Sequence, residues 1–566
     1  MPVLKIENLN VRYDRESKKD AVHQVSLSLK EGECVGLIGE SGSGKSTIAL
    51  AIMGLLHKRA EVKGSIWFEN KNLLKISDRD MEYVRWDRIA IVYQNGLDVL
   101  NPVISVGEQI AEAITRHTGM QKRPAREKAE DMLVKTGLET YWYDAFPHQL
   151  SGGMRQKVLI AMALSCNPDI LIADEPTMAL DVPAKNEIIS LLKNMQKKEG
   201  FSLLVISHEL PVISALADSV AVMYMGNILE IADTKELLLN PLHPYTRGLI
   251  YSSPAILPMR DMWGIAGEIV IHSENECPFY SRCTQRVEQC LNENPPLSVS
   301  SDGRKIACLR GGIVTLLEGS GLNKSYKSGK RELKVCSDCS IRIRSGEVAA
   351  LIGESGSGKT TLAQILSGII SPDSGIVRFE DRAVLGNSES RKKHGIQIVF
   401  QDPFSSTNEQ FTVREIVQEG LDIIKSGSQS ERREQVTEAL FKVGLPYDGG
   451  FLSRKGHTLS GGQRQRVAIA RALVMEPKLL IADEISSMLD PSSAANLLRL
   501  LKELQNRSGF SMLYITHDIA LAQKISDYVY IMKKGKIVEH GNAGEIFANP
   551  KENETKNLIE VISIRQ

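Results

Sequence analysis

Two glycine-rich segments with the pattern G-x-x-x-x-G-K-[ST] lie at residues 39–46 and 353–360, each after a short apolar run. In this pattern the glycines let backbone N–H groups surround a phosphate, while the lysine reaches the β- and γ-phosphates of a nucleotide. The next hydroxyl is suited to Mg²⁺, and the helix that follows adds its positive end to the anion site. We therefore predict two loops that bind ATP. Their predicted contact residues are Gly39, Ser41, Gly42, Gly44, Lys45, Ser46 and Thr47, and Gly353, Ser355, Gly356, Gly358, Lys359, Thr360 and Thr361.

Two acidic pairs end later apolar runs, Asp174-Glu175 and Asp483-Glu484. Phosphoryl transfer needs positioning and charge neutralisation more than covalent chemistry. We expect each aspartate to hold Mg²⁺ through water and each glutamate to polarise the attacking water. An isolated pair of this kind is more often a helix cap or a surface acid. Because the pair follows the phosphate loop in both halves, the catalytic interpretation is favoured.

His208 and His517 each end a further apolar run. A neutral imidazole at such a place can hydrogen-bond the γ-phosphate and so report whether it is present. A single histidine is usually a structural residue with satisfied hydrogen bonds. Its recurrence in both halves favours a catalytic role.

The chain is an internal duplication. LIGESGSGK occurs at 37–45 and 351–359, an offset of 314 residues, while LSGG, IADE and the two histidines recur at an offset of 309. Several matches in one order indicate a repeat. The change in offset places a net deletion of five residues between the second phosphate loop and its LSGG, an interval expected to be helical.

Short apolar runs precede each motif and predict the elements that position them. Continuous apolar strands suit a buried, mostly parallel sheet covered by helices, with ligands at the carboxyl ends of the strands. The predicted fold class is α/β, with two phosphate-loop nucleotide-binding domains in tandem and a small cysteine-rich extension between them. The expected boundaries are 1–260, 261–312 and 313–566. The runs lie at 35–39, 169–175 and 201–208 and again at 349–353, 478–484 and 510–517.

Composition excludes some classes of partner and location. The 566 residues carry 69 Lys plus Arg and 69 Asp plus Glu, so the net charge is zero. The chain therefore has no overall positive charge to attract nucleic acid, and nucleic acid is not expected as a partner. The N-terminus has no apolar signal region, and no run approaches the ~18 apolar residues of a spanning helix. A cytoplasmic location is expected, peripheral if the chain serves a membrane.

These residues together resemble the ATP-binding cassette (ABC) family. The marks are GESGSGKS and GESGSGKT, the glutamines of VYQ and VFQ, LSGGMRQK and LSGGQRQRV, the acidic pairs, the loops MALD and SMLD, and the two histidines. The resemblance implies Mg²⁺ held by Ser46, Gln94 and Asp174 in one site and Thr360, Gln401 and Asp483 in the other. Gln94 and Gln401 are also assigned to catalysis, with Glu175, Glu484, His208 and His517.

The family arrangement is a head-to-tail sandwich with two ATP molecules between the cassettes. Ser460 and Gly462 would then complete the site at Lys45, and Ser151 and Gly153 would complete the site at Lys359. A helix that begins at LSGG offers N–H groups and a dipole to the γ-phosphate. Tyr13 and Tyr326 lie where the family stacks an aromatic ring on adenine, although either could be a strand residue that packs on its neighbours.

A closer resemblance is to ATPase subunits of peptide and nickel importers. It is carried by NPLHPYTRGLI at 240–250, followed by CPFYSRC and two further cysteines. The resemblance implies an iron–sulfur cluster with four ligands, Cys277, Cys283, Cys290 and Cys308. The residues themselves indicate metal rather than disulfide in a cytosolic chain, and four thiolates satisfy either [4Fe–4S] or Zn²⁺. Free buried thiols are the alternative.

The sequence departs from the family pattern at several positions. Ile485 replaces a proline, Asn95 and Gly96 replace Asp-Pro, Glu409 replaces a proline, and the second half lacks the proline-histidine-tyrosine run. None of these changes removes a catalytic side chain. Several lie near the glutamine loop, the family's surface for a membrane partner.

The resemblance implies an ATPase that drives import of short peptides or of nickel and other metal chelates. It would work on the inner face of the cell membrane with two membrane permease subunits and an extracytoplasmic substrate-binding protein. The alternative is a soluble ABC ATPase that remodels or activates a protein partner. A short cysteine-bearing linker disfavours translation factors, and the absence of zinc insertions disfavours DNA repair. A structural protein with dead sites is disfavoured by the complete motif sets.

Overall fold

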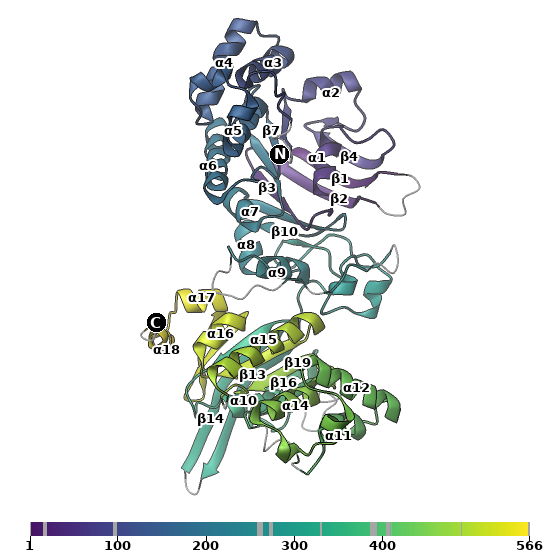
Figure 1. Ribbon diagram of the computed structural model, residues 1–566, viewed down its shortest axis with the longest axis vertical. Helices are drawn as coiled ribbons and strands as arrows, with labels where there is room; N and C mark the ends of the chain where they lie inside the picture. The colour runs from purple at the N-terminus through teal and green to yellow at the C-terminus, as the bar shows by residue number, and fades with distance from the viewer. Residues whose placement is uncertain are drawn as a thin grey trace. The chain divides into compact units, whose positions relative to one another are not determined.

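The computed structural model describes residues 2–14, 20–93, 99–256, 264–265, 267–270, 275–328, 331–384, 393–402, 408, 410–487 and 489–563. The chain divides into two compact units. The first holds residues 1–256, 270–281 and 287–312, and the second holds 257–269, 282–286 and 313–566. The expected extension, 261–312, is thus divided between the two units. Each unit has the mixed α/β architecture of one half of the repeat (Figure 1).

The first unit contains two sheets. Their strands are β1 (Pro2–Arg12), β2 (Val22–Lys30), β3 (Cys34–Ile38), β4 (Glu61–Phe68), β5 (Lys71–Asn72), β6 (Ile89–Val92), β7 (Ile170–Asp174), β8 (Ser202–Ser207), β9 (Ser219–Tyr224), β10 (Asn227–Asp233), β11 (Ser298–Val299) and β12 (Lys305–Ile306). The smaller sheet has the antiparallel order β2-β1-β4-β5. The larger has the order β11-β12-β10-β9-β3-β8-β7-β6.

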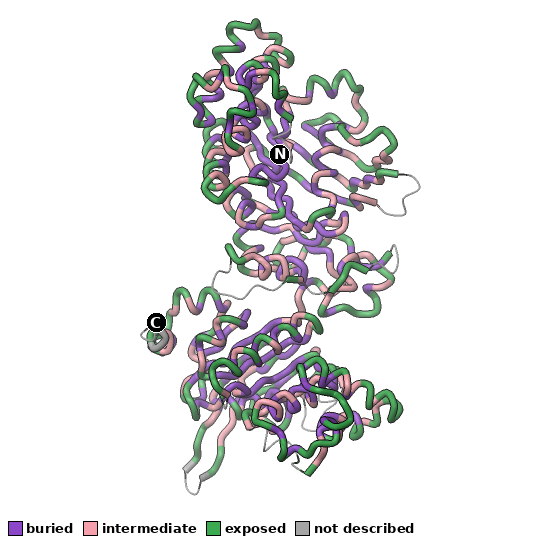
Figure 2. Tube along the Cα trace, viewed as in Figure 1, coloured by how far each residue is buried: buried purple, intermediate pink, exposed green. Residues whose placement is uncertain are grey.

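Strands β3, β8 and β7 are consecutive neighbours in the larger sheet and are buried along their whole length (Figure 2). They pair in parallel, so their carboxyl ends meet at one edge. The continuous apolar runs of the sequence therefore become strands covered on both faces, as a parallel sheet requires. This edge collects the phosphate loop, the acidic pair and the histidine.

The helices of the first unit pack around this sheet. They are α1 (Lys45–Ile52), α2 (Asp78–Val84), α3 (Val106–Thr118), α4 (Lys122–Lys135), α5 (Gly152–Leu164), α6 (Val182–Glu199), α7 (Leu210–Leu216), α8 (Thr234–Leu239) and α9 (Pro244–Tyr251). Helices α3, α4 and α5 pack on one another, and α7 packs on β3 and β8 (Figure 1). Asp181 caps α6 because its carboxylate accepts a hydrogen bond from the Ala184 N–H at 2.9 Å.

The second unit repeats the plan. Its strands are β13 (Thr315–Ser328), β14 (Arg331–Arg344), β15 (Val348–Ile352), β16 (Ser374–Phe379), β17 (Arg382–Ala383), β18 (Ile396–Val399), β19 (Leu479–Asp483), β20 (Ser511–Thr516), β21 (Tyr528–Lys533) and β22 (Lys536–Asn542). Its helices are α10 (Lys359–Leu366), α11 (Val413–Ile423), α12 (Gln429–Lys442), α13 (Gly449–Leu452), α14 (Gly461–Leu473), α15 (Pro491–Ser508), α16 (Ile519–Ile525), α17 (Ala543–Ala548) and α18 (Asn553–Ser563). The sheets have the orders β14-β13-β16-β17 and β18-β19-β20-β15-β21-β22.

Most of the length difference between the halves lies between the phosphate-loop helix and the next pair of equivalent helices, α3 and α11. The phosphate-loop helices α1 and α10 start 314 residues apart, but α3 and α11 already start 307 apart. The helices α5 and α14, which follow LSGG, start 309 apart. The loss therefore lies in the strands and connections between the phosphate loop and α11, and two residues are regained before LSGG. Surface connections tolerate such changes better than packed helices do.

The segment after the first cassette extends the larger sheet. Strand β12 pairs antiparallel with β10, and β11 pairs with β12. The strand pairing attaches the part of the segment that carries Cys308 to the first unit. Among the helices in the described ranges, none combines the length and apolar character needed to cross a membrane.

Candidate functional site

The first phosphate loop connects β3 to α1 and is pressed against neighbouring backbone. A Cβ on Gly39 would lie 2.0 Å from the carbonyl oxygen of Met223, and one on Gly44 would lie 2.3 Å from that of Ala21. Gly44 also has a positive φ of 99°, which glycine adopts without strain. These glycines are therefore required by the close approach of the loop to β9 and to the start of β2.

Lys45 is buried over this loop. Its ammonium donates hydrogen bonds to the carbonyls of Gly39 and Glu40, both at 2.9 Å, and to the Ser43 hydroxyl at 3.3 Å. Burial lowers the pKa of Lys45, and the negative charges of Glu175 and Asp174 oppose that shift. The loop thus concentrates one buried cation and a row of backbone groups, as a phosphate site requires.

Asp174 ends β7 next to Ser46 and is 4% exposed. Burial raises the pKa of its carboxyl, and a hydrogen bond from the Ser46 hydroxyl opposes that shift. Its Oδ1 is buried without a hydrogen-bond partner among the described residues. An unpaired buried carboxylate oxygen costs free energy unless a cation binds it. Carboxylate and hydroxyl oxygens are the donors that Mg²⁺ prefers, so this pair fits a magnesium site.

The second unit has the same features. A Cβ on Gly353 would lie 2.2 Å from the carbonyl oxygen of Met532. The Lys359 ammonium donates to the carbonyls of Gly353 and Glu354 at 2.9 Å. Asp483 is buried, burial raises the pKa of its carboxyl, and a hydrogen bond from the Thr360 hydroxyl opposes that shift. The donor set of Asp483 and Thr360 therefore fits Mg²⁺ as well.

Both glutamates of the acidic pairs have a left-handed backbone, with φ of 50° at Glu175 and 48° at Glu484. A non-glycine residue in this region costs of the order of 1–3 kcal/mol and is enriched at functional sites. A hydrogen bond from each glutamate N–H to the neighbouring strand holds the turn, to Ile206 O at 2.9 Å and to Ile515 O at 3.0 Å. The same strained turn in both units aims each glutamate past the end of its strand.

The two glutamates differ in the side chain that lies closest to them. Glu175 Oε1 lies 2.7 Å from His208 Nδ1 and also accepts from the His208 N–H at 3.0 Å. Glu484 Oε1 instead lies 3.2 Å from Lys359 Nζ, with His517 Nδ1 3.6 Å from Oε2. The structure therefore brings each predicted histidine to its glutamate, and more closely in the first unit.

The LSGG segments begin helices α5 and α14. Ser151 Oγ accepts from the Met154 N–H, and Ser460 Oγ accepts from the Gln463 N–H, both at 3.3 Å. Gln463 Oε1 accepts in return from the Ser460 N–H at 3.1 Å, which completes a capping box in the second unit only. A Cβ on Gly462 would meet no atom within 4 Å, and one on Gly153 would meet the Ala184 Cβ at 3.2 Å. Both helix N-termini can offer N–H groups to an anion.

The remaining residues that the sequence assigns to the ATP sites differ in the neighbours they contact. Tyr13 Oη lies 3.0 Å from Thr47 Oγ1, so the half-exposed ring of Tyr13 stands beside the phosphate-loop helix. Tyr326 is equally exposed, with Lys324 Nζ 5.9 Å from its ring centroid. Gln401 Nε2 donates to Ser487 Oγ at 3.3 Å, which links its loop to the turn after Glu484. Gln94 lies outside the described residues.

The four cysteines assigned to a metal do not form a metal site in the described residues. Cys277, Cys290 and Cys308 belong to the first unit, and Cys283 lies in a stretch grouped with the second. Burial raises the pKa of Cys277 to about 12, and the Cys290 and Cys308 thiols add to the shift. Within the described ranges, no three His, Cys, Asp or Glu side chains are placed to hold a metal ion. The present arrangement does not fit an iron–sulfur cluster or zinc.

The other cysteines are core residues. Cys34 and Cys166 are buried. Cys336 and Cys339 are buried on β14, and the Cys339 thiol donates to the Gly535 carbonyl at 3.1 Å. Burial of all four thiols and the hydrogen bond of Cys339 explain these positions by packing.

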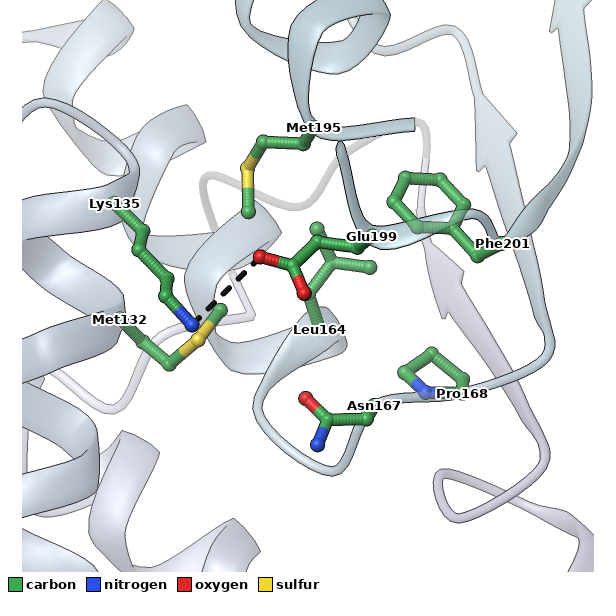
Figure 3. Close-up of a pocket in the computed structure, with 8 residues that line it drawn as sticks. All are labelled: Met132, Lys135, Leu164, Asn167, Pro168, Met195, Glu199 and Phe201. Carbon is green, nitrogen blue, oxygen red and sulfur yellow. Dashed lines mark ion pairs between the residues drawn. The ribbon is translucent and has the colours of Figure 1, made fainter. Parts of the chain in front are cut away.

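A cavity of about 60 Å³ lies between α4, α5 and α6 (Figure 3). Lys135 and Glu199 approach across it, with Nζ 3.7 Å from Oε1. This volume is far below the ~300 Å³ or more of an ordinary small-molecule site, so the cavity is too small for a nucleotide. No motif residue lines it; the lining consists of Met132, Lys135, Leu164, Asn167, Pro168, Met195, Glu199 and Phe201.

One contact to the first phosphate loop lies outside the predicted site. Tyr245 Oη accepts a hydrogen bond from the Glu40 N–H at 3.1 Å. Tyr245 belongs to the proline-histidine-tyrosine run, which the sequence singles out only as a mark of resemblance. No spacing rule connects residues 205 positions apart, so only the fold reveals this contact.

Comparison with known proteins agrees with this geometry. The family model described as ABC transporter matches residues 22–178 and 336–487, and the model described as oligopeptide/dipeptide transporter, C-terminal region, matches residues 229–290. The oligopeptide transport ATP-binding protein OppD of Mycobacterium tuberculosis is 35% identical over 99% of this chain and 98% of its own length. The glutathione import ATP-binding protein GsiA of Salmonella typhimurium is 36% identical over 99% of this chain and 90% of its own.

Among solved structures, a dimeric ATP-binding cassette bound to ADP and Pi in a post-hydrolysis state aligns with 40% of this chain and 99% of that chain, at 29% identity and a TM-score of 0.37. The two segments matched by the ABC transporter model contain both phosphate loops and both acidic pairs, and the two relatives align with nearly all of this chain. The chain therefore belongs to the ABC transporter family, as a phosphate-loop ATPase with two cassettes in tandem.

Proposed function

We propose that this chain is the ATP-hydrolysing subunit of an importer for short peptides, acting on the inner face of the cell membrane. The observation that carries the proposal is the oligopeptide/dipeptide transporter segment at residues 229–290, joined directly to the first cassette. Relatives named for oligopeptide transport and for import of glutathione, itself a tripeptide, support the same cargo class. Two membrane permease subunits and an extracytoplasmic binding protein would complete the machine.

The proposed chemistry uses the same parts in each unit. Lys45 and Lys359 bind the β- and γ-phosphates, and Ser46 with Asp174 and Thr360 with Asp483 hold Mg²⁺. The metal supplies charge neutralisation at the phosphates when it is bound. Glu175 and Glu484 orient the attacking water from their strained turns, and His208 and His517 orient those glutamates and sense the γ-phosphate. Gln401 and its counterpart Gln94 are proposed to join the Mg²⁺ shell.

We propose further that each site is completed by the other cassette. Ser460 and Gly462 would close on the nucleotide held at Lys45, and Ser151 and Gly153 on that held at Lys359. The capped helix N-termini at these residues support this role because they present N–H groups to an anion. Tyr13 and Tyr326 are proposed adenine contacts, and the exposure of both rings leaves them available for stacking.

The test is to isolate the tagged chain from mildly solubilised membranes and identify its partners by mass spectrometry. We expect two polytopic membrane proteins in equal amounts and an associated binding protein. Uptake of a labelled tripeptide, of glutathione and of a nickel chelate then assigns the cargo in cells with and without the chain. Peptide uptake that depends on the chain supports the proposal. Soluble partners alone would contradict it and favour activation of a protein partner, while nickel uptake alone would change the cargo class.

A [4Fe–4S] cluster at Cys277, Cys283, Cys290 and Cys308, with Zn²⁺ as the alternative, stays a prediction from the family resemblance. Anaerobically purified protein should be analysed for iron, acid-labile sulfide and zinc. About four irons and four sulfides per chain, lost in Cys290→Ser and kept in the core control Cys166→Ser, would support the cluster. Protein free of metal with all eight thiols titratable would agree with the present arrangement.

A further inference from the structure

We infer that Tyr245 is a positioning residue of the first ATP site, and that this support distinguishes the first phosphate loop from the second. The inference rests on ATP binding by the first cassette and is independent of the transported cargo. It begins with the peptide group between Gly39 and Glu40. The carbonyl of this peptide accepts from Lys45 Nζ at 2.9 Å, and its N–H donates to Tyr245 Oη at 3.1 Å. Hydrogen bonds to both the carbonyl and the N–H of this peptide therefore hold the start of the phosphate loop.

The Tyr245 ring is completely buried and its orientation is set by two aromatic neighbours, Tyr224 and Phe279. Its centroid lies 4.7 Å from that of Tyr224 and 5.6 Å from that of Phe279. Phe279 also contacts His243 edge-on at 5.5 Å. Tilted and edge-on contacts at these distances are favourable and restrict ring rotation. The hydroxyl therefore has little freedom to leave the loop.

The backbone of α9 is anchored independently of these rings. The buried carboxylate of Glu230 on β10 accepts from the N–H groups of Leu242 at 2.9 Å and His243 at 2.8 Å. His243 Nδ1 in turn accepts from the Tyr245 N–H at 3.0 Å, which caps the helix. This chain of bonds connects the sheet, the helix cap and the phosphate loop through one tyrosine.

The second cassette has the same buried-glutamate anchor but lacks the aromatic contact. Glu539, 309 residues after Glu230, accepts from the N–H groups of Lys551 at 2.9 Å and Glu552 at 3.2 Å. At the same offset, Tyr224 and Tyr245 are replaced by Lys533 and Glu554, whose charged atoms lie 3.3 Å apart. A half-exposed ion pair thus replaces two buried rings. The paired change within one chain indicates that the aromatic contact is specific to the first site.

Phe279 extends this contact into the cysteine-bearing segment. It lies two residues after Cys277, is 2% exposed, and touches Tyr224, His243 and Tyr245. Any rearrangement of this segment that moves Phe279 would loosen the ring that holds the loop. The conservative change Phe279→Leu should therefore weaken ATP binding at the first site without removing a polar group.

The test measures ATP binding at each cassette of the full chain separately. Photolabelling with an azido-ATP probe and Mg²⁺ is titrated, and labelled peptides are assigned to each half by mass spectrometry. The variants are Tyr245→Phe, Phe279→Leu, the matched second-cassette change Glu554→Gln, and the surface control Tyr141→Phe. Tyr245→Phe removes the hydroxyl that accepts from the Glu40 N–H and keeps the ring.

For Tyr245→Phe we expect half-saturation of the first cassette at an ATP concentration about five-fold higher, or ~1 kcal/mol, with the second cassette unchanged. KM should rise while kcat at saturating ATP stays close to wild type. Phe279→Leu should shift the first-cassette binding curve by less. Glu554→Gln and Tyr141→Phe should leave the binding curves of both cassettes unchanged. An unchanged first-cassette curve, an equal shift in both cassettes, or a lower melting temperature alone would overturn the inference.

Discussion

At the scale of single residues, each predicted site contains a glutamate held in a strained turn. Positive φ at Glu175 and Glu484 carries each side chain beyond its strand, where a histidine lies at 2.7 Å in the first unit and 3.6 Å in the second. Because strain costs stability, its presence at the same position of both halves supports a role in chemistry over one in packing.

The first prediction concerns these glutamates. Glu175→Gln keeps the size of the side chain and removes its charge, so it should lower ATP turnover by about 10²-fold or more through loss of the base that orients water. Steady-state phosphate release measures the rate, and Glu187→Gln on the exposed side of α6 is the control. A Glu175→Gln protein with the wild-type rate would exclude Glu175 from catalysis.

At the scale of elements, the cap of α9 depends on a buried histidine. His243 is fully buried, and burial lowers its pKa to about 3 from the usual 6.5. Its neutral ring accepts from the Tyr245 N–H, and the unfolded chain takes up a proton more readily than the folded one. The resulting stability is present above pH 6.5 and is lost progressively as the pH falls from 6.5 towards 3.

The prediction is that His243→Asn, which can cap the helix without titrating, reduces the acid sensitivity of the first unit. Between pH 6.5 and pH 5 the histidine should cost about 2 kcal/mol that the asparagine variant does not lose. Thermal unfolding at pH 7.5, 6.5 and 5 measures this, with the exposed His148→Asn as control. Equal acid sensitivity in wild type and His243→Asn would contradict a buried neutral ring.

At the scale of the whole molecule, two units carry the same plan with different details. The capping box at Ser460, the ion pair of Lys533 and Glu554, and the closer histidine in the first unit all distinguish the halves. Two similar backbones with different side chains suit an ATPase whose two sites differ in affinity, as the proposed support by Tyr245 also implies.

The corresponding prediction tests the proposed composite sites. Gly462→Asp has room for its side chain and puts a negative charge at the N-terminus of α14, where it should repel a γ-phosphate. If the cassettes close head to tail, ATP labelling at Lys45 in the first cassette should fall at least about ten-fold, with little change at Lys359. Gly153→Asp should give the converse pattern. Loss of labelling in the mutated cassette itself would contradict the composite arrangement.

The motifs and their order were enough to predict the α/β class, the duplication and the edge where the sites form. Strands β3, β7 and β8 are apolar throughout, and their parallel pairing necessarily brings Lys45, Asp174 and His208 together. Local sequence suffices there because each motif directly follows its strand. The four cysteines assigned to a metal do not each follow a buried strand, so their spacing alone does not bring them together. Among the described residues they form no metal site.

Contacts between distant segments were decided by the tertiary structure. The position of the seven-residue loss before α11, the addition of β12 to β10 and the hydrogen bond from Glu40 to Tyr245 have no counterpart in spacing or composition. The contact of Tyr245 depends on packing between segments that are far apart in the sequence, because Tyr224 and Phe279 together orient its ring. The sequence by itself thus determined the chemistry and the number of the sites, and the packing around them determined how the two sites differ.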